Sequence, residues 1–387
     1  MKPRVLKIFL YTTLLSLFSF YSCSSLERKI SFTEQFLEIK GVGAYGIFDP
    51  SVVMDRQSNK IYMSYSAVDP SYRWPVEHPH AISTRLAYSL DKGLTWNDSG
   101  LAINEAEDEE GQKLSLKLFG RSPKPMTWNQ EVSSLIFDAN APRSERWKLF
   151  WHRYPLIDGE RKFEYGWIAF KQAESPEQLA SAKEIKLFSG KYYDSAADQY
   201  LGTPQVQLNR IHPELSDCVA FTEPSAFIKE KRLYLALSCA DGNLPWNGRQ
   251  ILLNRQDGNW NYVGILLDNR RDSDGLQIAG NSFTGFSAPE LIAVRDKTYL
   301  AVTPTTNGEN PAYHGCIVFE IEDLDSAKIL RESKFLKISK VVPGNSELHN
   351  GACSYLNVMS ETGGFLLSQA YPESVKVFRI IRTEIKL

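Results

Sequence analysis

One pattern of apolar and polar positions recurs along this chain. A few polar or small residues lead into an apolar run, a short polar turn follows, and a second run rich in Tyr or Leu completes the unit. Short apolar runs bounded by turn residues are typical of β-strands, so each unit predicts a β-hairpin. The five predicted hairpins span residues 49–65, 134–151, 223–237, 288–302 and 351–368.

Further apolar runs lie between the hairpins and supply candidate outer strands. They include residues 85–89, 166–170, 316–320 and 375–381. Five units of four strands, arranged around an axis, bury their apolar faces against one another. The pattern therefore predicts an all-β fold, a five-bladed β-propeller with four-stranded antiparallel blades, over residues 36–387. We expect residues 38–46 to help close the ring against the C-terminal strands. A two-sheet sandwich is the alternative, but it does not explain five copies of one hairpin.

The composition agrees with this fold class and limits the partners. Aromatic residues make up 12% of the chain, which also has 24 Gly and 19 Pro. Such a composition favours short strands and tight turns over a helical bundle. The formal net charge is −2 and no long basic run occurs, which argues against nucleic acid as a partner.

The N-terminus has the features of an export signal. Three basic residues fall within the first seven positions, an apolar run extends from Ile8 to Tyr21, and Ser22 precedes Cys23. The apolar run is short for a membrane-spanning helix. A small residue before a Cys at this point resembles the bacterial lipoprotein signal, in which the Cys is lipidated. We expect residues 1–22 to be a signal peptide, residues 23–35 a tether, and the protein to be lipid-anchored in a bacterial cell envelope, in the periplasm or at the cell surface. An ordinary secretory signal is the alternative.

Export changes the interpretation of the other cysteines. Cys218, Cys239, Cys316 and Cys353 remain after Cys23, an even number in a compartment that permits disulfides. Four cysteines allow three pairings, and buried free thiols are a further alternative. No close C-x-x-C spacing occurs, so a thiolate metal site is not expected.

A turn motif falls between two strands of the first unit. Residues 89–96 read Ser-Leu-Asp-Lys-Gly-Leu-Thr-Trp, which resembles the Asp box of sialidase-type propellers. In this motif Asp and Gly close a tight turn and the Trp packs back against the strands. Asp91 is therefore interpreted as a structural residue and not as a catalytic acid.

Two carboxylates open inner strands in similar surroundings. Asp49 stands in Phe-Asp-Pro-Ser and Glu223 in Thr-Glu-Pro-Ser. Over nearly the whole mature chain, these motifs and the hairpin repeat resemble the five-bladed glycoside hydrolases, the superfamily of arabinanases, β-xylosidases and levansucrases. The resemblance implies that both carboxylates face one cavity at the mouth of the channel. There, a pair of carboxyl groups can act as general acid and as base or nucleophile at a glycosidic bond, and we assign the acid to Glu223.

The chain departs from the family pattern in the second and fourth units. The family has a second Asp at the start of the second blade, whereas this chain has Val132, with Glu131 displaced by one residue. Glu131 is therefore a weaker third catalytic candidate. Glu290 follows its Pro and is one step out of phase with Asp49, so strand alternation turns its side chain the other way. Each of these carboxylates could instead serve only to accept backbone hydrogen bonds.

Other residues are candidates for binding substrate. Tyr72 and Trp74 lie in an aromatic loop that could stack on a sugar ring or could be structural. Arg85 and Arg153, together with Arg121, could line a pocket. An Arg cluster would favour the sialidases, which resemble six-bladed propellers, as an alternative. His349 opens the fifth unit, where related enzymes often hold a calcium ion, although a hydrogen-bonded structural His is the simpler interpretation.

Two functions of different class remain open. The first is an exported glycoside hydrolase, and the second is a non-catalytic propeller that binds glycan or protein. The sequence does not decide whether the protein is an enzyme. For either function we expect a carbohydrate ligand, a membrane contact through the lipid, a monomer, no metal site and no cofactor beyond a structural calcium ion in the channel.

Overall fold

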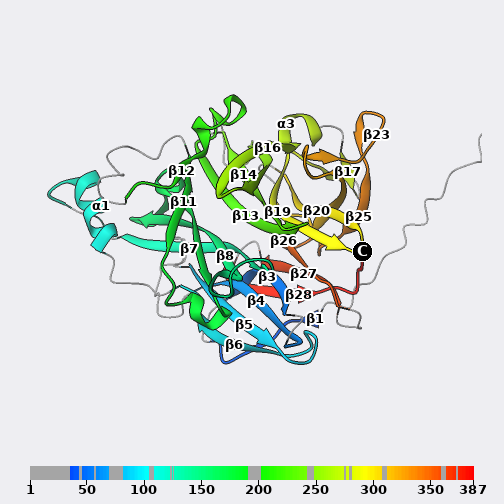
Figure 1. Cartoon of the computed structure of the whole chain (residues 1–387), viewed down its shortest axis with the longest axis horizontal. Helices are drawn as coiled ribbons and strands as arrows, with labels where there is room; N and C mark the ends of the chain where they lie inside the picture. The colour runs from blue at the N-terminus through cyan, green and yellow to red at the C-terminus, as the bar shows by residue number, and fades with distance from the viewer. Residues whose placement is uncertain are drawn as a thin grey trace, which may run out of the picture. The chain divides into compact units, whose positions relative to one another are not determined.

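The five predicted hairpins form the inner two strands of five β-sheets in the computed structural model, which confirms the all-β propeller (Figure 1). The structure describes residues 35–42, 46–55, 58–68, 82–103, 109–122, 124, 126–190, 202–241, 248–273, 276–278, 281–306, 312–358, 363–371 and 374–387. Each hairpin is longer than its apolar run, because polar residues at both ends continue the pairing. Among the described residues, no helix is long and apolar enough to cross a bilayer.

The blades follow one another in chain order, and each begins with its innermost strand. Blade one contains β3 (Ile47–Asp55), β4 (Lys60–Val68), β5 (Ile82–Ser89), β6 (Trp96–Leu101) and β2 (Ile39–Lys40). Blade two contains β7 (Met126–Phe137), β8 (Trp147–Ile157), β10 (Trp167–Ala173), β11 (Ile185–Ser189) and β12 (Val206–Gln207), and β9 (Glu160–Arg161) pairs with β8. Blade three contains β13 (Ala220–Lys229), β14 (Arg232–Ala240), β15 (Gly248–Gln256) and β16 (Asn259–Asp268).

The last two blades complete the ring. Blade four contains β19 (Gly285–Val294), β20 (Lys297–Thr305) and β21 (Cys316–Asp323), with β22 (Lys328–Ile329) and β25 (Ile338–Val342) both paired to β21. Blade five contains β26 (His349–Leu356), β27 (Gly364–Tyr371), β28 (Ser374–Arg382) and β1 (Gln35–Phe36). Two short ribbons stand apart, β17 (Gln277–Ile278) with β18 (Asn281–Ser282) and β23 (Arg331–Glu332) with β24 (Phe335–Leu336).

Helical segments are short and lie in the connections. Among the described residues, the α-helices are α1 (Glu109–Phe119) and α3 (Asn269–Asp272). The 3₁₀ turns are η1 (Arg143–Glu145), η2 (Phe163–Tyr165), η3 (Pro176–Leu179), η4 (Leu208–Arg210) and η5 (Pro213–Leu215).

Two details differ from the predicted architecture. The blades have four to six strands and not four throughout, because β2 and β12 add parallel edge strands and β9 and β25 add further pairings. The ring is closed by β1, which pairs with β28, and by Leu37, whose N–H donates to the Ile380 carbonyl at 2.8 Å. The closing residues therefore precede the predicted segment 38–46, part of which instead forms β2 in blade one.

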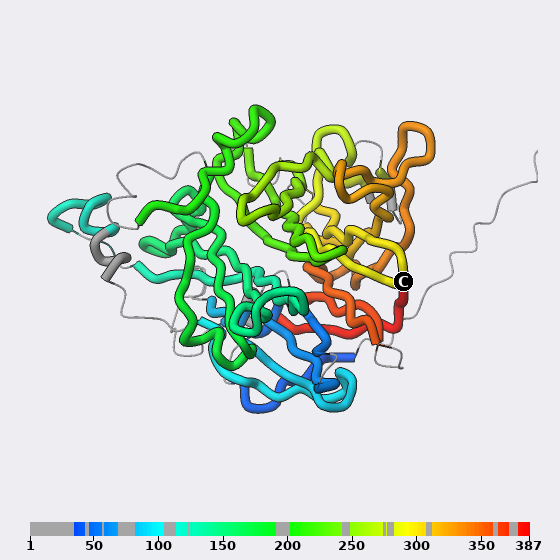
Figure 2. The backbone as a smooth tube through the Cα atoms, in the orientation of Figure 1, coloured from blue at the N-terminus to red at the C-terminus, as the bar shows by residue number. Residues whose placement is uncertain are grey.

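Five apolar clusters account for the packing between blades. One cluster joins each pair of neighbouring blades; for example, Tyr62 and Leu86 of blade one pack with Trp147 and Trp151 of blade two. The others join blades two and three, three and four, four and five, and five and one. Alternate residues of a strand point to opposite faces, so each sheet presents an apolar face to both neighbours. Figure 2 shows the resulting succession of blades along the backbone.

Each innermost strand carries a bulge at the same place. Pairing with the second strand shifts register after Phe48, Glu131, Thr222, Ser287 and Gly351. The next residue in every case has a left-handed backbone, with φ of 49° at Asp49, 49° at Val132, 54° at Glu223, 46° at Ala288 and 48° at Ala352. Non-glycine residues seldom adopt this conformation, and bulges re-aim side chains. The five positions are therefore structurally equivalent, and blade two has Val132 at this position.

The turn between β5 and β6 is held by its own side chains. Asp91 accepts hydrogen bonds from the Thr95 backbone at 2.8 Å, from the Thr95 hydroxyl at 2.6 Å and from the Ser89 hydroxyl at 2.8 Å. Trp96 is fully buried, and its Nε1 donates to the Gly93 carbonyl at 3.1 Å. The hydrogen bonds to its carboxylate lower the pKa of Asp91 to about 2. Asp91 is structural, as its sequence context predicts.

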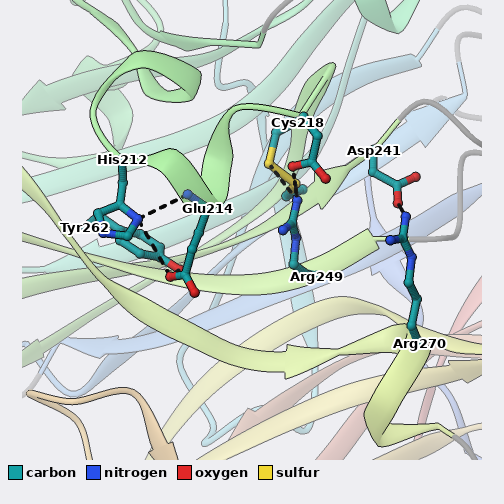
Figure 3. Close-up of polar contacts among 9 residues, drawn as sticks. His212, Glu214, Cys218, Asp241, Arg249, Tyr262 and Arg270 are labelled. Carbon is teal, nitrogen blue, oxygen red and sulfur yellow. Dashed lines mark hydrogen bonds and ion pairs between the residues drawn. A yellow bond between two sulfur atoms is a disulfide. The ribbon is translucent and has the colours of Figure 1, made fainter.

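Two disulfides are present. Cys218 pairs with Cys239 within blade three, where Figure 3 shows the bond beside Arg249. Cys316 on β21 pairs with Cys353 on β26, so this bond links blade four to blade five. The structure thus selects one of the three pairings left open by the sequence.

Candidate functional site

A cavity of about 560 Å³ lies where the five innermost strands begin. Every blade lines it with the bulge residue and the residue before it. These pairs are Phe48 and Asp49, Glu131 and Val132, Thr222 and Glu223, Ser287 and Ala288, and Gly351 and Ala352. The bulges thus bring the three acids singled out in the sequence into one cavity.

Asp49 is held by its own blade and by the next. Its Oδ2 accepts a hydrogen bond from the Ser66 hydroxyl at 3.1 Å, and the same hydroxyl accepts one from the Val132 N–H at 3.1 Å. Burial raises the pKa of Asp49 well above its usual value, and the nearby Glu131 and Glu223 carboxylates raise it further. An acid with a raised pKa can hold or exchange a proton near neutral pH.

Glu223 has the same kind of surroundings two blades on. Its Oε2 accepts hydrogen bonds from the Ser238 hydroxyl at 2.5 Å and from the Ala288 N–H at 2.8 Å. Ser238 stands where Ser66 stands in blade one, and Ala288 is the bulge residue of the following blade. Burial raises the pKa of Glu223, although these two hydrogen bonds oppose the shift. Both bonds fall on Oε2, so Oε1 is the oxygen that can meet a molecule in the cavity.

Glu131 reaches the cavity although it is displaced from the bulge. It is 9% exposed, and its Oε1 accepts a hydrogen bond from the Tyr154 hydroxyl. Asn129 donates to that hydroxyl at 3.1 Å, and its own Oδ1 accepts from the Ile82 N–H at 3.1 Å. The series of hydrogen bonds from Asn129 to Tyr154 and from Tyr154 to Glu131 fixes the carboxylate.

Glu290 does not face the cavity, because it stands in register with Ser51 and not with Asp49. Its Oε2 accepts from the Ser225 hydroxyl at 2.9 Å and its Oε1 from the Ser354 hydroxyl at 3.1 Å. Burial raises the pKa of Glu290 to about 7. The predicted difference in strand phase between Glu290 and Asp49 is confirmed. Glu290 instead links its blade to both neighbouring blades through hydrogen bonds.

Two predicted substrate-binding arginines lie elsewhere. Arg85 pairs with Asp98 on the outer side of blade one. Arg153 pairs with Glu184 at 2.6 Å and stacks over the rings of Trp128 and Trp167. Neither lines the cavity, because each is held by its ion pair with a carboxylate of its own blade. Tyr72, Trp74 and Cys23 lie outside the described residues.

His349 lines the cavity as expected, and it is hydrogen-bonded. Its Nδ1 accepts from the Ala312 N–H at 3.0 Å, while the Asn350 amide donates to two backbone carbonyls and accepts from Gln369. Among the described residues, no group of three His, Cys, Asp or Glu side chains is placed to hold a metal.

Several polar residues of the cavity have no marker in the sequence. Arg161 on β9, His152 on β8 and Tyr313 all line it. Burial and the nearby Glu223 raise the pKa of Tyr313. Arg161 and Tyr313 belong to connections, not to the repeated hairpin, so repeat analysis could not find them.

One wall of the cavity is apolar. Phe48 and Phe378 stack with ring centroids 4.5 Å apart, and they pack with Val68 and Ile82. Phe163 also lines the cavity. Aromatic faces beside carboxylates suit a sugar, whose ring has apolar faces and polar edges.

Comparisons with known proteins bear on the fold. No family model and no curated protein matches the sequence. The chain is similar to the Bombyx mori GH32 beta-fructofuranosidase, with a TM-score of 0.52, 10% identity, and coverage of 91% of this chain and 62% of that one. It is also similar to an endo-arabinase from Bacteroides thetaiotaomicron (TM-score 0.48, 14% identity, 92% and 98% covered). A third similar structure is a family 117 glycoside hydrolase from Zobellia galactanivorans, with a TM-score of 0.49, 12% identity, and coverage of 92% of this chain and 91% of that one. The likeness to the beta-fructofuranosidase shows a shared fold.

Proposed function

We propose that this protein acts on carbohydrate as a glycoside hydrolase, with the cavity as its active site. The observation that carries the proposal is the equivalence of Asp49 and Glu223. Both are bulge residues with a left-handed backbone, both line one cavity, and each is held by a serine of its own blade. A pair of carboxyl groups in one cavity is the arrangement that glycoside hydrolysis requires. The beta-fructofuranosidase of similar fold supports the same substrate class.

The proposed roles follow from the surroundings of each acid. Three neighbouring acids repel one another when ionised, so the cavity keeps a proton more readily than an isolated carboxyl group would. Glu223 would donate that proton to the leaving oxygen. Asp49, whose pKa is raised by burial and by the Glu131 and Glu223 carboxylates, would be the base that activates water or the nucleophile. Glu131 would keep the pair in unequal protonation states.

The test is hydrolysis of a panel of aryl glycosides by wild type, Glu223→Gln and Asp49→Asn. Glu290→Gln is the matched control, because it removes a buried acid outside the cavity. Loss of a general acid lowers kcat on the order of 10²–10⁴-fold. The loss in Glu223→Gln should shrink with a dinitrophenyl leaving group, which departs without protonation, whereas the loss in Asp49→Asn should not. Wild-type turnover in Glu223→Gln would remove Glu223 from the mechanism.

A non-catalytic carbohydrate-binding propeller is the second candidate, and Val132 favours it. The position that carries an acid in the resembled family carries an apolar side chain here. Saccharide binding without turnover on any glycoside of the panel would establish this alternative. The sialidase alternative has lost its basis, because the propeller has five blades and Arg85 and Arg153 do not line the cavity.

We further propose that the protein is exported and held in a bacterial cell envelope by a lipid on Cys23. The support is the sequence alone, in which basic residues, an apolar run and Ser22 precede Cys23. Cys23→Ala should move the protein from the detergent phase to the aqueous phase, with Cys23→Ser as a parallel variant. Unchanged partitioning would show that this residue is not the anchor. We expect a monomer that binds no nucleic acid.

A further inference from the structure

One corner of the cavity is built by blade two from residues that the proposed hydrolysis does not use. Arg161 lies on β9, whose backbone pairs with the end of β8 through Leu156. His152 on β8 and Phe163 in η2 line the cavity next to it. We call Arg161, His152 and Phe163 the blade-two corner.

Arg161 presents an unpaired guanidinium to the cavity. Its side chain lines the cavity, and among the described residues it makes no hydrogen bond and no ion pair, although its charge lies near the Glu131 and Asp49 carboxylates. An arginine that serves as counter-ion to a carboxylate normally pairs with it through two parallel hydrogen bonds. Here the Asp49, Glu131 and Glu223 carboxylates accept from hydroxyl and backbone donors instead. The N–H donors of the Arg161 guanidinium are therefore available to a ligand.

His152 supplies a second observation at the same corner. It is 2% exposed, and its Nε2 has no hydrogen-bond partner among the described residues. Its position on the second strand is the one that Ser66, Ser238, Thr303 and Ser368 occupy in the other blades. Those four hydroxyls each take part in an inter-blade or carboxylate hydrogen bond. Blade two has replaced a structural hydroxyl by an imidazole that lines the cavity.

The His152 imidazole is neutral, so it can form a hydrogen bond without carrying a charge. Burial, together with the nearby Arg161 charge, lowers the pKa of His152 to about 3. The ring stacks on Phe163, with centroids 5.6 Å apart and an interplanar angle of 23°. Neutral His152 can donate one hydrogen bond, while Arg161 stays charged and Phe163 offers an apolar face.

We propose that the blade-two corner is a subsite for an anionic substituent, a carboxylate or a sulfate, on the bound sugar. This inference rests on the proposed function and names its substrate class as acidic saccharides. Arg161 would bind the two oxygens of the anion, and the sugar ring would lie against Phe163. Glu164 also lines the cavity, so an anion placed away from Arg161 would be repelled by the Asp49, Glu131, Glu164 and Glu223 carboxylates.

The test uses matched methyl glycosides that differ at C6 alone: methyl galactoside, methyl galacturonide and methyl galactoside 6-sulfate, with the glucose series beside them. Binding is measured by saturation-transfer NMR and calorimetry on wild type, Arg161→Met, Arg161→Lys and Arg295→Met. Arg295 is an exposed arginine in the turn after β19, which does not line the cavity. Thermal unfolding checks that each variant folds.

Wild type should bind one acidic member at least about 10-fold more tightly than its neutral counterpart, the magnitude of one charged hydrogen-bonded contact. Arg161→Met should abolish this preference, Arg161→Lys should keep part of it, and Arg295→Met should keep all of it. The preferred member distinguishes carboxylate from sulfate. Equal binding of neutral and acidic members, or an equal loss of both in Arg161→Met, would overturn the subsite and leave the proposed function intact. Binding of none of the sugars would overturn the subsite, whereas the proposed function is decided separately by the aryl glycoside panel.

Discussion

Glu290 in blade four occupies the strand position that Ser51 occupies in blade one. At this position Ser51, Ser134, Ser225 and Ser354 each accept a hydrogen bond from a backbone N–H of the following blade, at 3.1, 2.8, 2.8 and 3.2 Å. Glu290 instead accepts from the serines of both neighbouring blades. A ring of inter-blade bonds is thus completed by a buried carboxyl group.

We expect this buried carboxyl group to make stability depend on pH. The pKa of Glu290 rises to about 7 in the fold, above its ordinary value of 4.5. A raised pKa means that the folded protein holds the proton more tightly, so this contribution is full below about pH 4.5 and is lost as pH rises through about 7. The loss is on the order of 3 kcal/mol.

Urea unfolding of wild type and Glu290→Gln from pH 4.5 to 8 measures this effect. Gln keeps the shape of the side chain but does not titrate, so the difference in unfolding free energy should change across that window in favour of the Glu290→Gln variant at high pH. A difference that stays constant with pH would show that Glu290 does not titrate there.

Tyr154 should influence the site through Glu131. Tyr154→Phe removes the donor to the Glu131 carboxylate and the acceptor for Asn129. The Glu131 carboxylate, which contributes to the raised pKa of Asp49, loses the hydrogen bond that holds it in place, so the acidic limb of the pH–activity profile should move. Unfolding should be easier by about 1–3 kcal/mol, because the Asn129 amide is left unsatisfied.

Tyr65→Phe is the matched control. Tyr65 is also fully buried and donates to a carboxylate, Asp98, at 2.6 Å, but it does not line the cavity. Tyr65→Phe should lower the free energy of unfolding without moving the pH–activity profile. The same shift in both variants, or in neither, would exclude a specific role for Tyr154.

The repeated hairpin made the ring and two of its acids predictable. Asp49 and Glu223 follow from the repeat because each opens an innermost strand, and the phase of Glu290 follows from strand alternation. The register shift after Thr222 has no marker in the sequence, but it turns Glu223 toward the cavity. Bulges depend on pairing with the second strand, which a local pattern does not encode.

The residues contributed by connections escaped prediction for a different reason. Arg161 reaches the cavity because β9 folds back on the end of β8, and the length of β8 depends on packing around it. Conversely, Arg153 was expected near the substrate but is held between two indole rings and Glu184. The sequence shows that an arginine is present, but only tertiary contacts decide which face of the blade it takes.

The disulfides lead to a chemical prediction. Protein purified from an oxidising compartment and unfolded without reductant should show no free thiol at Cys218, Cys239, Cys316 and Cys353. Peptide mapping should recover the two expected pairs. Cys316→Ala with Cys353→Ala should cost about 3–4 kcal/mol, because the bond closes a loop with a sequence separation of 37 residues. Free thiols, or a different pairing, would contradict the structure.

Val132 should be a strained residue whose replacement stabilises the protein. Its φ is 49°, a conformation that a β-branched side chain adopts only with strain, whereas Asn adopts it readily. Val132→Asn should therefore raise the free energy of unfolding by about 1 kcal/mol, because Val132 lines the cavity and contributes little to the apolar clusters. Val132→Ala is the control, since it removes the branch but keeps the left-handed backbone, and it should gain less. Urea unfolding at one pH compares the three proteins. If the Val132→Asn variant is no more stable than the Val132→Ala variant, the strain is relieved elsewhere, and apolar contacts of Val132 in the cavity wall explain why a valine stands there.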